Sequence, residues 1–420
     1  MTAKKEIQVY AHWEGFNDPV LMGTLLATPA KGKEVFSFAY TKEWLQSGFT
    51  YMIDPDLQLY PGSYYPKDEK PNFGAFLDSC PDRWGRVLME RREAALARKE
   101  MRETRQLLES DFLLGVYDAH RMGGLRFKTD EAGNFMNDDR HMAAPPFTSL
   151  RELEQASLNF EKDDVEDKDY LKWINLLIAP GSSLGGARPK ASVLDPHGHL
   201  WIAKFPSVKD EKDIGAWEMV LNKLGTEAGV NMAQGNVKQF NNPYHTYLTK
   251  RFDRTENDRV HFASAMTLLG YSDGAGHDTG VSYLNLAEFL MQQGADVNTD
   301  LEELWRRIVF FICVKNTDDH LRNHGFLLTD RGWRLSPAFD LNPNEYGNGL
   351  SLNISETDNS LELQLALSVA EYFRVDEKKA NAIIDQVQQS VAMWRSVARH
   401  YGIPKAEQDR MARSFDIVSG

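Results

Sequence analysis

The sequence predicts an α+β protein of two lobes, in which a β-rich part comes first and a mainly helical part follows. Residues 6–13, 20–27 and 34–40 are rich in β-branched and aromatic side chains and are separated by Gly, Pro and Asn, a pattern typical of strands. Residues 301–316 and 377–401 repeat their apolar positions at helical spacing. A chain of 420 residues is also too long for one small core, which favours two or three packed units.

Changes in composition divide the chain into three expected parts. Residues 129–148 are polar and then marked by prolines, so we place a boundary there and assign residues 1–148 to an N-terminal, β-rich part. Residues 149–255 combine helices with short strands, and helical patterns dominate residues 256–420. The candidate sites described below fall in the second and third parts.

Charge and cysteine content argue against several functional classes. Acidic residues outnumber basic ones by 61 to 48, and a net charge of −13 repels nucleic-acid backbones. The two cysteines, Cys80 and Cys313, have no metal-ligand spacing and cannot form a disulfide framework. No apolar run approaches the ~18 residues of a membrane span, and the first residues contain no apolar leader. We therefore expect a cytoplasmic protein with no membrane association.

The glycine-rich segment GSSLGGARPKA, residues 181–191, is the first candidate for phosphate binding. Glycines allow backbone N–H groups to approach phosphate oxygens without interference from a Cβ atom. The segment is not a Walker A loop, because Ala187 and Arg188 stand where Lys and Ser or Thr are required. Taken alone, it is compatible with an ordinary turn as well as with a nucleotide loop.

Lys204 follows in the otherwise apolar strand LWIAKFP, residues 200–206. A buried ammonium group is costly unless it is paired. A strand lysine after a glycine loop could bind the α- and β-phosphates of ATP and a helix glutamate, for which Glu218 is the expected partner. The alternative is an edge-strand lysine whose side chain extends to water.

The segment NTDDHLRNHGF, residues 316–326, carries the strongest chemical signal. Asp318 and Asn323 have the Asp-x4-Asn spacing of a kinase catalytic loop, in which the carboxylate accepts a proton and the amide oxygen binds a metal. Two metal-site alternatives stay open. His320 and His324 have the i, i+4 spacing of a zinc helix but lack its glutamate, and Asp318, Asp319 and His320 could serve a metal hydrolase. A structural turn is the third alternative.

Asp340, in LSPAFDLNP, lies 22 residues after Asp318 and beyond an expected β-hairpin. A kinase places its second metal-binding aspartate after such a hairpin, and Asp340 would hold Mg²⁺ together with Asn323. Glycine loop, strand lysine, helix glutamate, hinge-like strand, Asp-x4-Asn and second aspartate thus occur in kinase order. This order predicts a two-lobed, protein-kinase-like fold.

The combined motifs resemble the HipA family of bacterial toxin serine/threonine kinases, and the resemblance covers most of the chain. The N-terminal part, residues 1–148, resembles the family's accessory subdomain through FGAFLDSCPDRWGRVLMERR (73–92) and DFLLGVYDAHRMGGLRF (111–127). In the expected kinase region it rests on SSLGGARPK, WIAKFP, KRFDR, NTDDHLRNHGF and LSPAFDL.

The resemblance implies an ATP- and Mg²⁺-dependent serine/threonine protein kinase. It makes Asp318 the catalytic aspartate, aided by Lys204 and Asn323, and it makes Asn323 and Asp340 the Mg²⁺ ligands. The strand TKRFDR, residues 249–254, would border the adenine as the hinge. The residues expected around the bound nucleotide are Ser183, Gly185, Gly186, Ala187, Lys190, Lys204, Lys250, Phe252, His320 and Asp340.

Regulation and partners are also implied by the resemblance. Family members autophosphorylate a serine of the glycine loop, which switches the kinase off; Ser183 matches this position and Ser182 is a rival. The family is paired with a small, DNA-binding, HipB-like antitoxin, so this chain would reach DNA only through that partner. The best-known substrates are aminoacyl-tRNA synthetases, whose inactivation halts translation and favours persistence. Two residues depart from the family pattern: Lys250 in the hinge, from which little effect is expected, and Arg188-Pro189 in the loop, where proline stiffens the backbone and removes one N–H donor for phosphate.

Two other functions would use the same scaffold. One is a small-molecule kinase, and the other is a kinase-shaped corepressor partner of a DNA-binding regulator. The four unlike polar residues Lys204, Asp318, Asn323 and Asp340 argue against a scaffold without activity.

Overall fold

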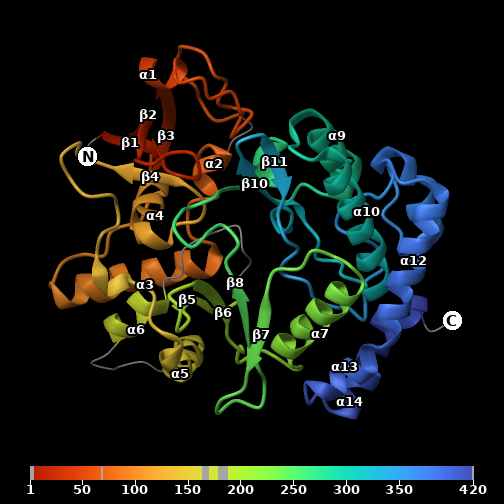
Figure 1. The fold of residues 1–420 in the computed structure, drawn as a ribbon. Coiled ribbons are helices and arrows are strands. Elements are labelled where there is room, and N and C mark those ends of the chain that lie inside the picture. The colour runs from red at the N-terminus through yellow and green to blue at the C-terminus, as the bar shows by residue number, and fades with distance from the viewer. Residues whose placement is uncertain (1–3, 68–69, 163–169, 178–187, 419–420) are drawn as a thin grey trace. The chain divides into compact units, whose positions relative to one another are not determined.

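Two compact units make up the chain in the computed structural model, which describes residues 4–67, 70–162, 170–177 and 188–418 (Figure 1). Unit 1 comprises residues 1–208, 251–272 and 327–330. Unit 2 comprises residues 209–250, 273–326 and 331–420. Each unit is therefore assembled from segments that are far apart in the sequence.

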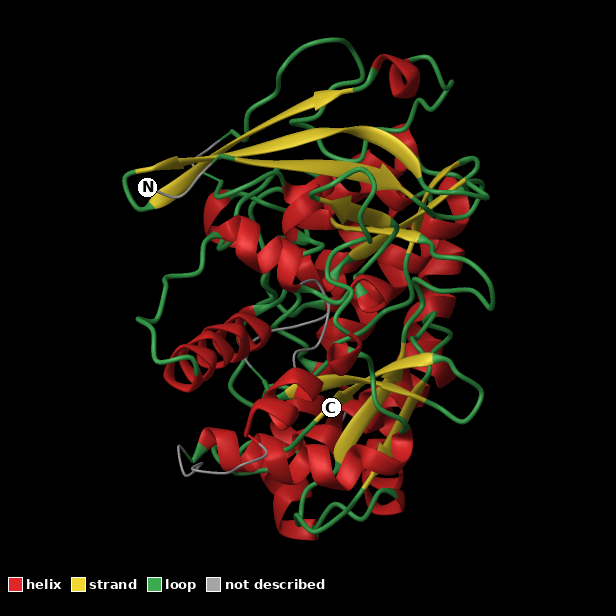
Figure 2. Ribbon diagram, turned by 90° about the vertical axis from the view of Figure 1, so that its left-hand side faces the viewer, coloured by secondary structure: helices red, strands yellow, loops and turns green. Residues whose placement is uncertain are grey.

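The N-terminal part of unit 1 is built on an antiparallel sheet with the strand order β3-β2-β1-β4, which runs from red to orange in Figure 1. Side chains alternate between the two faces of a strand, and Ile7, Val9 and Ala11 of β1 are fully buried on one face. The register of β1 with β2 shifts between Val9 and Tyr10. Figure 2 shows the strands of this sheet as long yellow arrows near the N-terminus. The strands are β1 Lys5–Ala11, β2 Val20–Ala30, β3 Lys33–Tyr40 and β4 Leu125–Lys128.

Helices cover the rest of unit 1, and the longest is α3. Asp82 caps its N-terminus by accepting a hydrogen bond from the Gly85 N–H at 2.8 Å. The helix ends at Lys99 because Met101 adopts a left-handed conformation with φ +52°. The helices are α1 Lys42–Leu45, α2 Gly74–Leu77, α3 Arg83–Lys99, α4 Glu109–Gly115, α5 Leu150–Glu161, α6 Tyr170–Leu177 and α8 Ala265–Leu268.

The remaining strands of unit 1 include the antiparallel pair β5 and β6, in which Lys190 lies opposite Lys204. Helices α5 and α6 contact β5. The bounds are β5 Lys190–Leu194, β6 Leu200–Lys204 and β9 His261–Ser264, with single 3-10 turns at Asp118–His120, Arg140–Met142 and Phe147–Ser149.

Unit 2 is organised around α10, which is buried along most of its length and lies beside α12 (Figure 1). Helices α7, α9 and α11 and the antiparallel pair β7–β8 complete this unit with the C-terminal helices. The bounds are α7 Ile214–Glu227, β7 Gly235–Lys238, β8 Thr246–Lys250, α9 Tyr283–Gln293, α10 Val297–Val314, β11 Gly332–Leu335, α11 Leu363–Ser368, α12 Glu377–Ala392, α13 Trp394–His400 and α14 Lys405–Met411. The strand β10 Gly325–Thr329 is divided, with its first two residues in unit 2 and the rest in unit 1. Shorter 3-10 segments occupy His277–Thr279, Leu321–Asn323, Ala370–Phe373 and Ala412–Val418.

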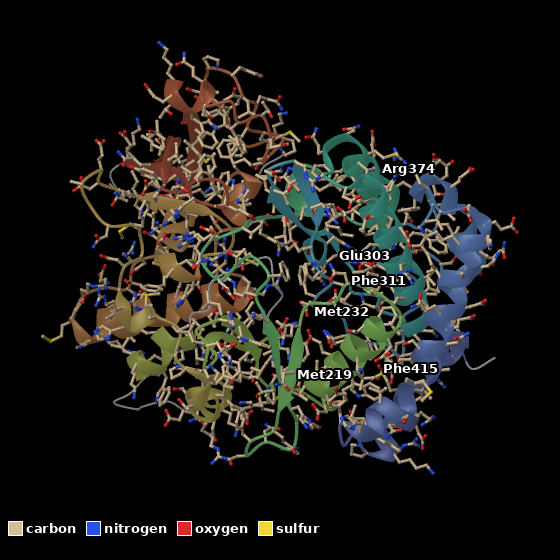
Figure 3. The ribbon with its side chains drawn as sticks, in the orientation of Figure 1. Met219, Met232, Glu303, Phe311, Arg374 and Phe415 are labelled. Carbon is tan, nitrogen blue, oxygen red and sulfur yellow. The ribbon has the colours of Figure 1, made fainter. Side chains whose placement is uncertain are left out.

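Aromatic and sulfur-containing side chains fill the core of unit 2 (Figure 3). Phe415, near the C-terminus, stacks on Trp394 with ring centroids 4.4 Å apart. Met232 packs against Gly225 of α7, where a Cβ atom would lie only 2.8 Å from the methionine sulfur. The glycine therefore fixes how closely the segment after α7 approaches that helix.

Most of the expected elements are confirmed within a few residues, and two differ for local reasons. The helical pattern at 377–401 is broken at Met393, after which Trp394 turns inward to meet Phe415. The hinge-like strand expected at 249–254 ends at Lys250. The acidic run at 163–169 lies outside the described residues. None of the described helices combines the length and apolar character needed to cross a membrane.

Candidate active site

The predicted catalytic loop begins where α10 ends. Lys315 adopts a left-handed conformation with φ +47°, and the N–H groups of Lys315 and Asn316 donate to the carbonyls of Ile312 and Phe311. These two bonds form a Schellman motif, which stops the helix after its apolar run. The polar loop therefore leaves the buried helix abruptly, as the sequence pattern indicated.

Polar side chains and backbone groups from residues 342–351 fix the first residues of the loop. The Asn342 N–H donates to Asn316 Oδ1 at 2.9 Å, and Asn344 Nδ2 donates to Thr317 Oγ1 at 2.7 Å. Ser351 Oγ donates to the Thr317 carbonyl at 2.7 Å. The loop conformation is thus specified by a segment that follows it by some thirty residues.

Asp318 and Asn323, the pair predicted from spacing, meet in the structure. Asn323 Nδ2 donates to the Asp318 carbonyl at 2.7 Å. This bond leaves the Asp318 side chain pointing outward, with 83% of it exposed. His320 Nε2 lies 3.9 Å from Asp318 Oδ1. The loop therefore presents a carboxylate to an incoming group while its backbone is held by the protein.

The amide oxygen of Asn323 is the unusual feature of this pair. Asn323 is only 9% exposed, and among the described residues Oδ1 has no hydrogen-bond partner. Most buried polar atoms are hydrogen-bonded, so an unpaired buried oxygen calls for a ligand. An amide oxygen is a ligand that Mg²⁺ and Ca²⁺ accept.

Asp340 lies in unit 2 with the catalytic loop and interacts electrostatically with Asp318. Partial desolvation raises the pKa of Asp318, the negative charge of Asp340 raises it further, and His320 opposes both effects. Asp340 itself adopts a left-handed conformation with φ +58° between the buried residues Phe339 and Leu341. Aspartate tolerates this conformation better than most residues, and such backbone conformations are common at functional sites.

Hydrogen bonds from neighbouring elements fix the segment between β11 and Asp340. Glu303 of α10, labelled in Figure 3, accepts the Asn231 N–H at 3.0 Å and Arg307 Nε at 2.8 Å. Arg307 Nη2 then donates to the Ser336 carbonyl at 2.6 Å. The Ala338 N–H donates to the Asn231 carbonyl at 2.7 Å. Helix α10 therefore positions both the loop that starts at its end and the segment that leads to Asp340.

Tyr247 of β8 and Glu218 of α7 belong to the same electrostatic environment. Burial raises the pKa of Tyr247 well above its usual value, and the charges of Glu218 and Asp340 add to the rise. Glu218 is 3% exposed. The predicted helix glutamate is thus buried in the unit that carries the catalytic loop.

These residues fit magnesium better than a transition metal. Asn323 Oδ1 and the Asp340 carboxylate supply hard oxygen atoms, and Mg²⁺ is commonly held by one or two such protein ligands together with phosphate and water. The described residues contain no cluster of three or more His, Cys, Asp or Glu side chains that could hold a metal, which weighs against the hydrolase alternative. The zinc-helix alternative is wrong, because residues 321–323 form a 3-10 turn and His324 Nε2 lies 3.1 Å from the Asp319 carbonyl.

Two of the three lysines predicted to bind nucleotide, Lys190 and Lys204, lie in unit 1 and are buried. Lys204, at the end of β6, is 5% exposed, so its side chain does not extend to water as the edge-strand alternative required. Lys190 is 3% exposed and forms an ion pair with Asp82 Oδ2 at 2.6 Å. Asp82 also caps α3, so Lys190 joins the start of β5 to the start of that helix. The contacts of both lysines with nucleotide stay predictions.

The other residues predicted around the nucleotide belong to the glycine loop and to the hinge. Ser182, Ser183, Gly185, Gly186 and Ala187 lie outside the described residues. At the predicted hinge, the Lys250 N–H donates to the Gln234 carbonyl at 2.9 Å, and the partly buried Phe252 ring lies 6.0 Å from that of Phe262.

Sequence reasoning missed the support of the loop by Asp319. This carboxylate is 1% exposed and accepts hydrogen bonds from the Tyr283 hydroxyl and the Ser351 N–H. Nothing local in the sequence marks Tyr283 or Ser351 as partners, because they lie 36 and 32 residues away from Asp319. Only the adjacency of two aspartates at 318 and 319 hinted that one of them could have a supporting role.

Comparisons with known proteins identify a family model and relatives that match the part of the chain carrying the kinase motifs. A family model described as the HipA-like C-terminal domain matches residues 182–394. The chain is 24% identical over 179 residues to a Haemophilus influenzae protein named "Putative kinase". It is 30% identical over 154 residues to a Sinorhizobium fredii protein named "Putative kinase Y4dM". These alignments cover 38% and 35% of this chain, but only 52% and 36% of the two relatives.

A solved structure resembles nearly the whole chain. It belongs to the Shewanella oneidensis MR-1 toxin–antitoxin system, in a complex of HipA, HipB and operator DNA. The TM-score is 0.63 at 17% identity, with 98% of this chain and 95% of the other covered. A likeness at this identity shows a shared fold, and it confirms the α+β, kinase-like architecture predicted above.

Proposed function

The chain belongs to the HipA-like family, as its motifs predicted, and from this premise we propose that it is an ATP- and Mg²⁺-dependent serine/threonine protein kinase. The observation that carries the proposal is the Asp318–Asn323 pair. One member presents an exposed carboxylate, and the other holds a buried amide oxygen without a hydrogen-bond partner in the described part of the chain. An acceptor for a hydroxyl proton next to an oxygen ligand for a cation is what phosphoryl transfer requires.

In this proposal the protein's side chains position the substrate hydroxyl, the metal ion and the phosphates, and one of them accepts the hydroxyl proton. Asp318 orients the substrate hydroxyl and accepts its proton, and the raised pKa of its carboxyl makes it a stronger base. Asn323 Oδ1 and Asp340 hold Mg²⁺, which when bound neutralises charge on the β- and γ-phosphates. Lys204 contacts the phosphates from β6, and Glu218 is the kinase-type partner that the motif order predicts for it.

The toxin role and its control belong to the same proposal. The structurally similar HipA chain comes from a complex with HipB and operator DNA, and this supports a HipB-like DNA-binding antitoxin as the partner. We propose that the chain phosphorylates a cellular protein, with an aminoacyl-tRNA synthetase as a candidate. Autophosphorylation at Ser183 or Ser182 would add roughly −1.5 to −2 charges to the glycine loop and so repel the phosphates of ATP.

The decisive experiment is incubation of the purified chain with Mg-[γ-³²P]ATP. Wild type is expected to incorporate label, and Asp318→Ala is expected to lower the rate by roughly 10²–10⁴-fold because the proton acceptor is lost. Asp385→Ala is the matched control, since Asp385 is an exposed aspartate of α12 in the same unit. Undiminished labelling in Asp318→Ala would contradict the assigned role. If wild type incorporates no label into protein but phosphorylates a sugar, that result would favour the small-molecule alternative.

A further inference from the structure

Asp319 is a buried carboxylate next to the proposed catalytic aspartate. Both of its oxygens are bound by the protein: Oδ1 accepts the Ser351 N–H at 2.7 Å and Oδ2 accepts the Tyr283 hydroxyl. With 1% of its surface exposed, it has no contact with solvent that a substrate could replace. Asp319 can therefore act only on the conformation of the loop and not directly on a substrate.

Tyr283, the donor to Asp319, is held rigidly. It is the first residue of α9 and is fully buried. Its N–H donates to the Asn353 carbonyl at 2.9 Å, and the Asn353 N–H donates to the Val281 carbonyl at 2.9 Å. A hydroxyl on such a ring has little freedom to leave its acceptor.

Tyr283 also contacts the other end of the loop. The edge of its ring packs against His324 with centroids 5.4 Å apart. His324 Nε2 lies 3.1 Å from the Asp319 carbonyl, and because a carbonyl can only accept, Nε2 carries the proton. One tyrosine thus contacts residues 319 and 324, which follow directly after Asp318 and Asn323.

We propose that Tyr283 and Asp319 are positioning residues that hold the Asp318 carboxylate and the Asn323 amide oxygen in the arrangement needed for phosphoryl transfer. The proposal deepens the proposed kinase function and rests on it. Neither residue touches substrate: they act through the backbone of residues 318 and 319 and through His324. A misplacement of reacting groups by about 1 Å can cost roughly 10²-fold in rate, so the expected effect is large.

A purely structural role explains these contacts less well. Replacing both partners of a buried hydrogen bond by apolar groups of the same shape can be nearly neutral or stabilising, so stability alone does not call for a tyrosine–carboxylate pair here. Burial raises the pKa of Asp319 to about 6, against the effect of its donors, so the group is ionised at neutral pH and accepts both bonds. Two fixed donors on one planar carboxylate define the orientation of the adjacent peptide in a way that apolar packing does not.

The test uses Tyr283→Phe and Asp319→Asn in the full chain. Both substitutions keep the shape of the side chain, and Tyr283→Phe keeps the ring contact with His324. Tyr40→Phe is the matched control, because the Tyr40 hydroxyl donates to the Leu57 carbonyl at 3.3 Å within unit 1. The measurements are kcat and KM for Mg-ATP in autophosphorylation, and hydrogen–deuterium exchange of residues 316–324.

We expect each variant to lower kcat by roughly 10- to 100-fold with KM for Mg-ATP changed less than about threefold. Exchange should accelerate in residues 316–324, and Tyr40→Phe should show neither change. The double variant should be little slower than Asp319→Asn, because both substitutions break the same bond. If Asp319→Asn does not fold, Tyr283→Phe decides alone.

Contrary results are distinct from failure of the proposed function. A wild-type kcat in Tyr283→Phe, or a fall that only matches its loss of folded protein, would overturn the positioning role. If wild type itself transfers no phosphate, the kinase proposal fails, and the hold of Tyr283 and Asp319 on the loop is then judged by hydrogen–deuterium exchange alone. Faster exchange confined to residues 316–324 in the variants would support that hold, and unchanged exchange would overturn it.

Discussion

Two regions rich in charged residues use their polar groups in opposite ways. In unit 2, the catalytic loop of residues 316–324 is held mainly by neutral donors, and it leaves the Asp318 carboxylate exposed and Asn323 Oδ1 without a partner among the described residues. In unit 1, the segment after β8 contributes to an arginine cluster whose acids are fully engaged by the protein. We define this cluster as Arg121, Arg251, Arg254 and Arg259 with the acids Asp118 and Asp253.

The centre of the arginine cluster is Asp253, which is fully buried. It accepts hydrogen bonds from Arg251 at 2.8 and 2.5 Å, from Arg254 at 2.6 Å and from the Gly123 N–H at 2.8 Å. Arg121, also fully buried, donates to the carbonyls of four residues: Ser79, Leu113, Val116 and Met136. The guanidinium groups of the cluster join segments of unit 1. Together with Arg126 they engage both oxygens of Asp118 and of Asp253, although Arg121 Nε and Arg259 Nη1 are buried without a partner among the described residues.

The comparison shows how a charged residue can be assigned to chemistry or to structure. An acid or amide that is open to a ligand keeps an exposed carboxylate or an unpaired oxygen, whereas both oxygens of each structural carboxylate in the cluster accept hydrogen bonds from the protein. Substitutions should therefore affect activity in the loop and stability in the cluster. The predictions below test that separation.

The largest separation is expected for Asp340→Asn. Asparagine has the same shape and also tolerates the left-handed conformation at φ +58°, so the free energy of unfolding should change by less than about 1 kcal/mol. Loss of the anionic metal ligand should lower the phosphotransfer rate by roughly 10³-fold. Denaturant unfolding and label incorporation measure the two quantities. A rate within tenfold of wild type would remove Asp340 from the site.

The converse is expected for Asp253→Ala. Removing one partner of a buried ion pair leaves Arg251 and Arg254 uncompensated, so the free energy of unfolding should fall by roughly 3 kcal/mol or more. The rate per folded molecule at saturating Mg-ATP should stay near that of wild type, and KM for Mg-ATP is measured separately because Asp253 lies in the predicted hinge segment 249–254. Asp258→Ala, at an exposed position of the same segment, serves as the control and should do neither. Full stability in Asp253→Ala would mean that the cluster is not structural.

Local patterns made part of this site predictable from sequence. The kinase-type spacing of Asp318 and Asn323 and the position of Asp340 are short-range or ordered features, so the loop and its neighbours could be named in advance. The apolar run of α10 likewise indicated where the polar loop emerges.

Long-range pairings could not be predicted in the same way. The bond from Lys190 to Asp82 joins residues 108 positions apart, and no local pattern in the sequence pairs them. The partners of Asp319 and the acids of the arginine cluster are likewise set by tertiary packing. A motif states which residue types are present, but only packing decides which of their atoms stay open.

Acid should destabilise both regions through one buried histidine in each, His120 beside the arginine cluster and His324 beneath the loop. Burial lowers the pKa of each to about 3, and nearby arginines lower it further. The unfolded chain, with a histidine pKa near 6.5, binds more protons between about pH 6.5 and 3. Stability is therefore highest above pH 6.5 and falls on acidification, by about 1.4 kcal/mol per pH unit for each group.

Glutamine variants separate the two histidines. Both His120→Gln and His324→Gln remove a buried titrating group. Each should therefore reduce the slope of unfolding free energy against pH between about pH 6 and 4 by about 1.4 kcal/mol per pH unit. Only His324→Gln should also lower kcat, because His324 donates to the loop. Equal losses of kcat in both variants would contradict the separation of the regions.

The smallest effect is expected for Lys315→Gly at the start of the loop. Glycine relieves the left-handed strain at φ +47°, worth about 1 kcal/mol, but it gives the unfolded chain more freedom, so the net gain in stability should stay below about 1 kcal/mol. The lost ion pair with Asp416 contributes little because Asp416 is 55% exposed. Arg374→Gly, at another left-handed position in unit 2 (Figure 3), is the control. Since Lys315 shapes only the helix end, kcat should be unchanged, and a tenfold fall would show that its ammonium group takes part in the site.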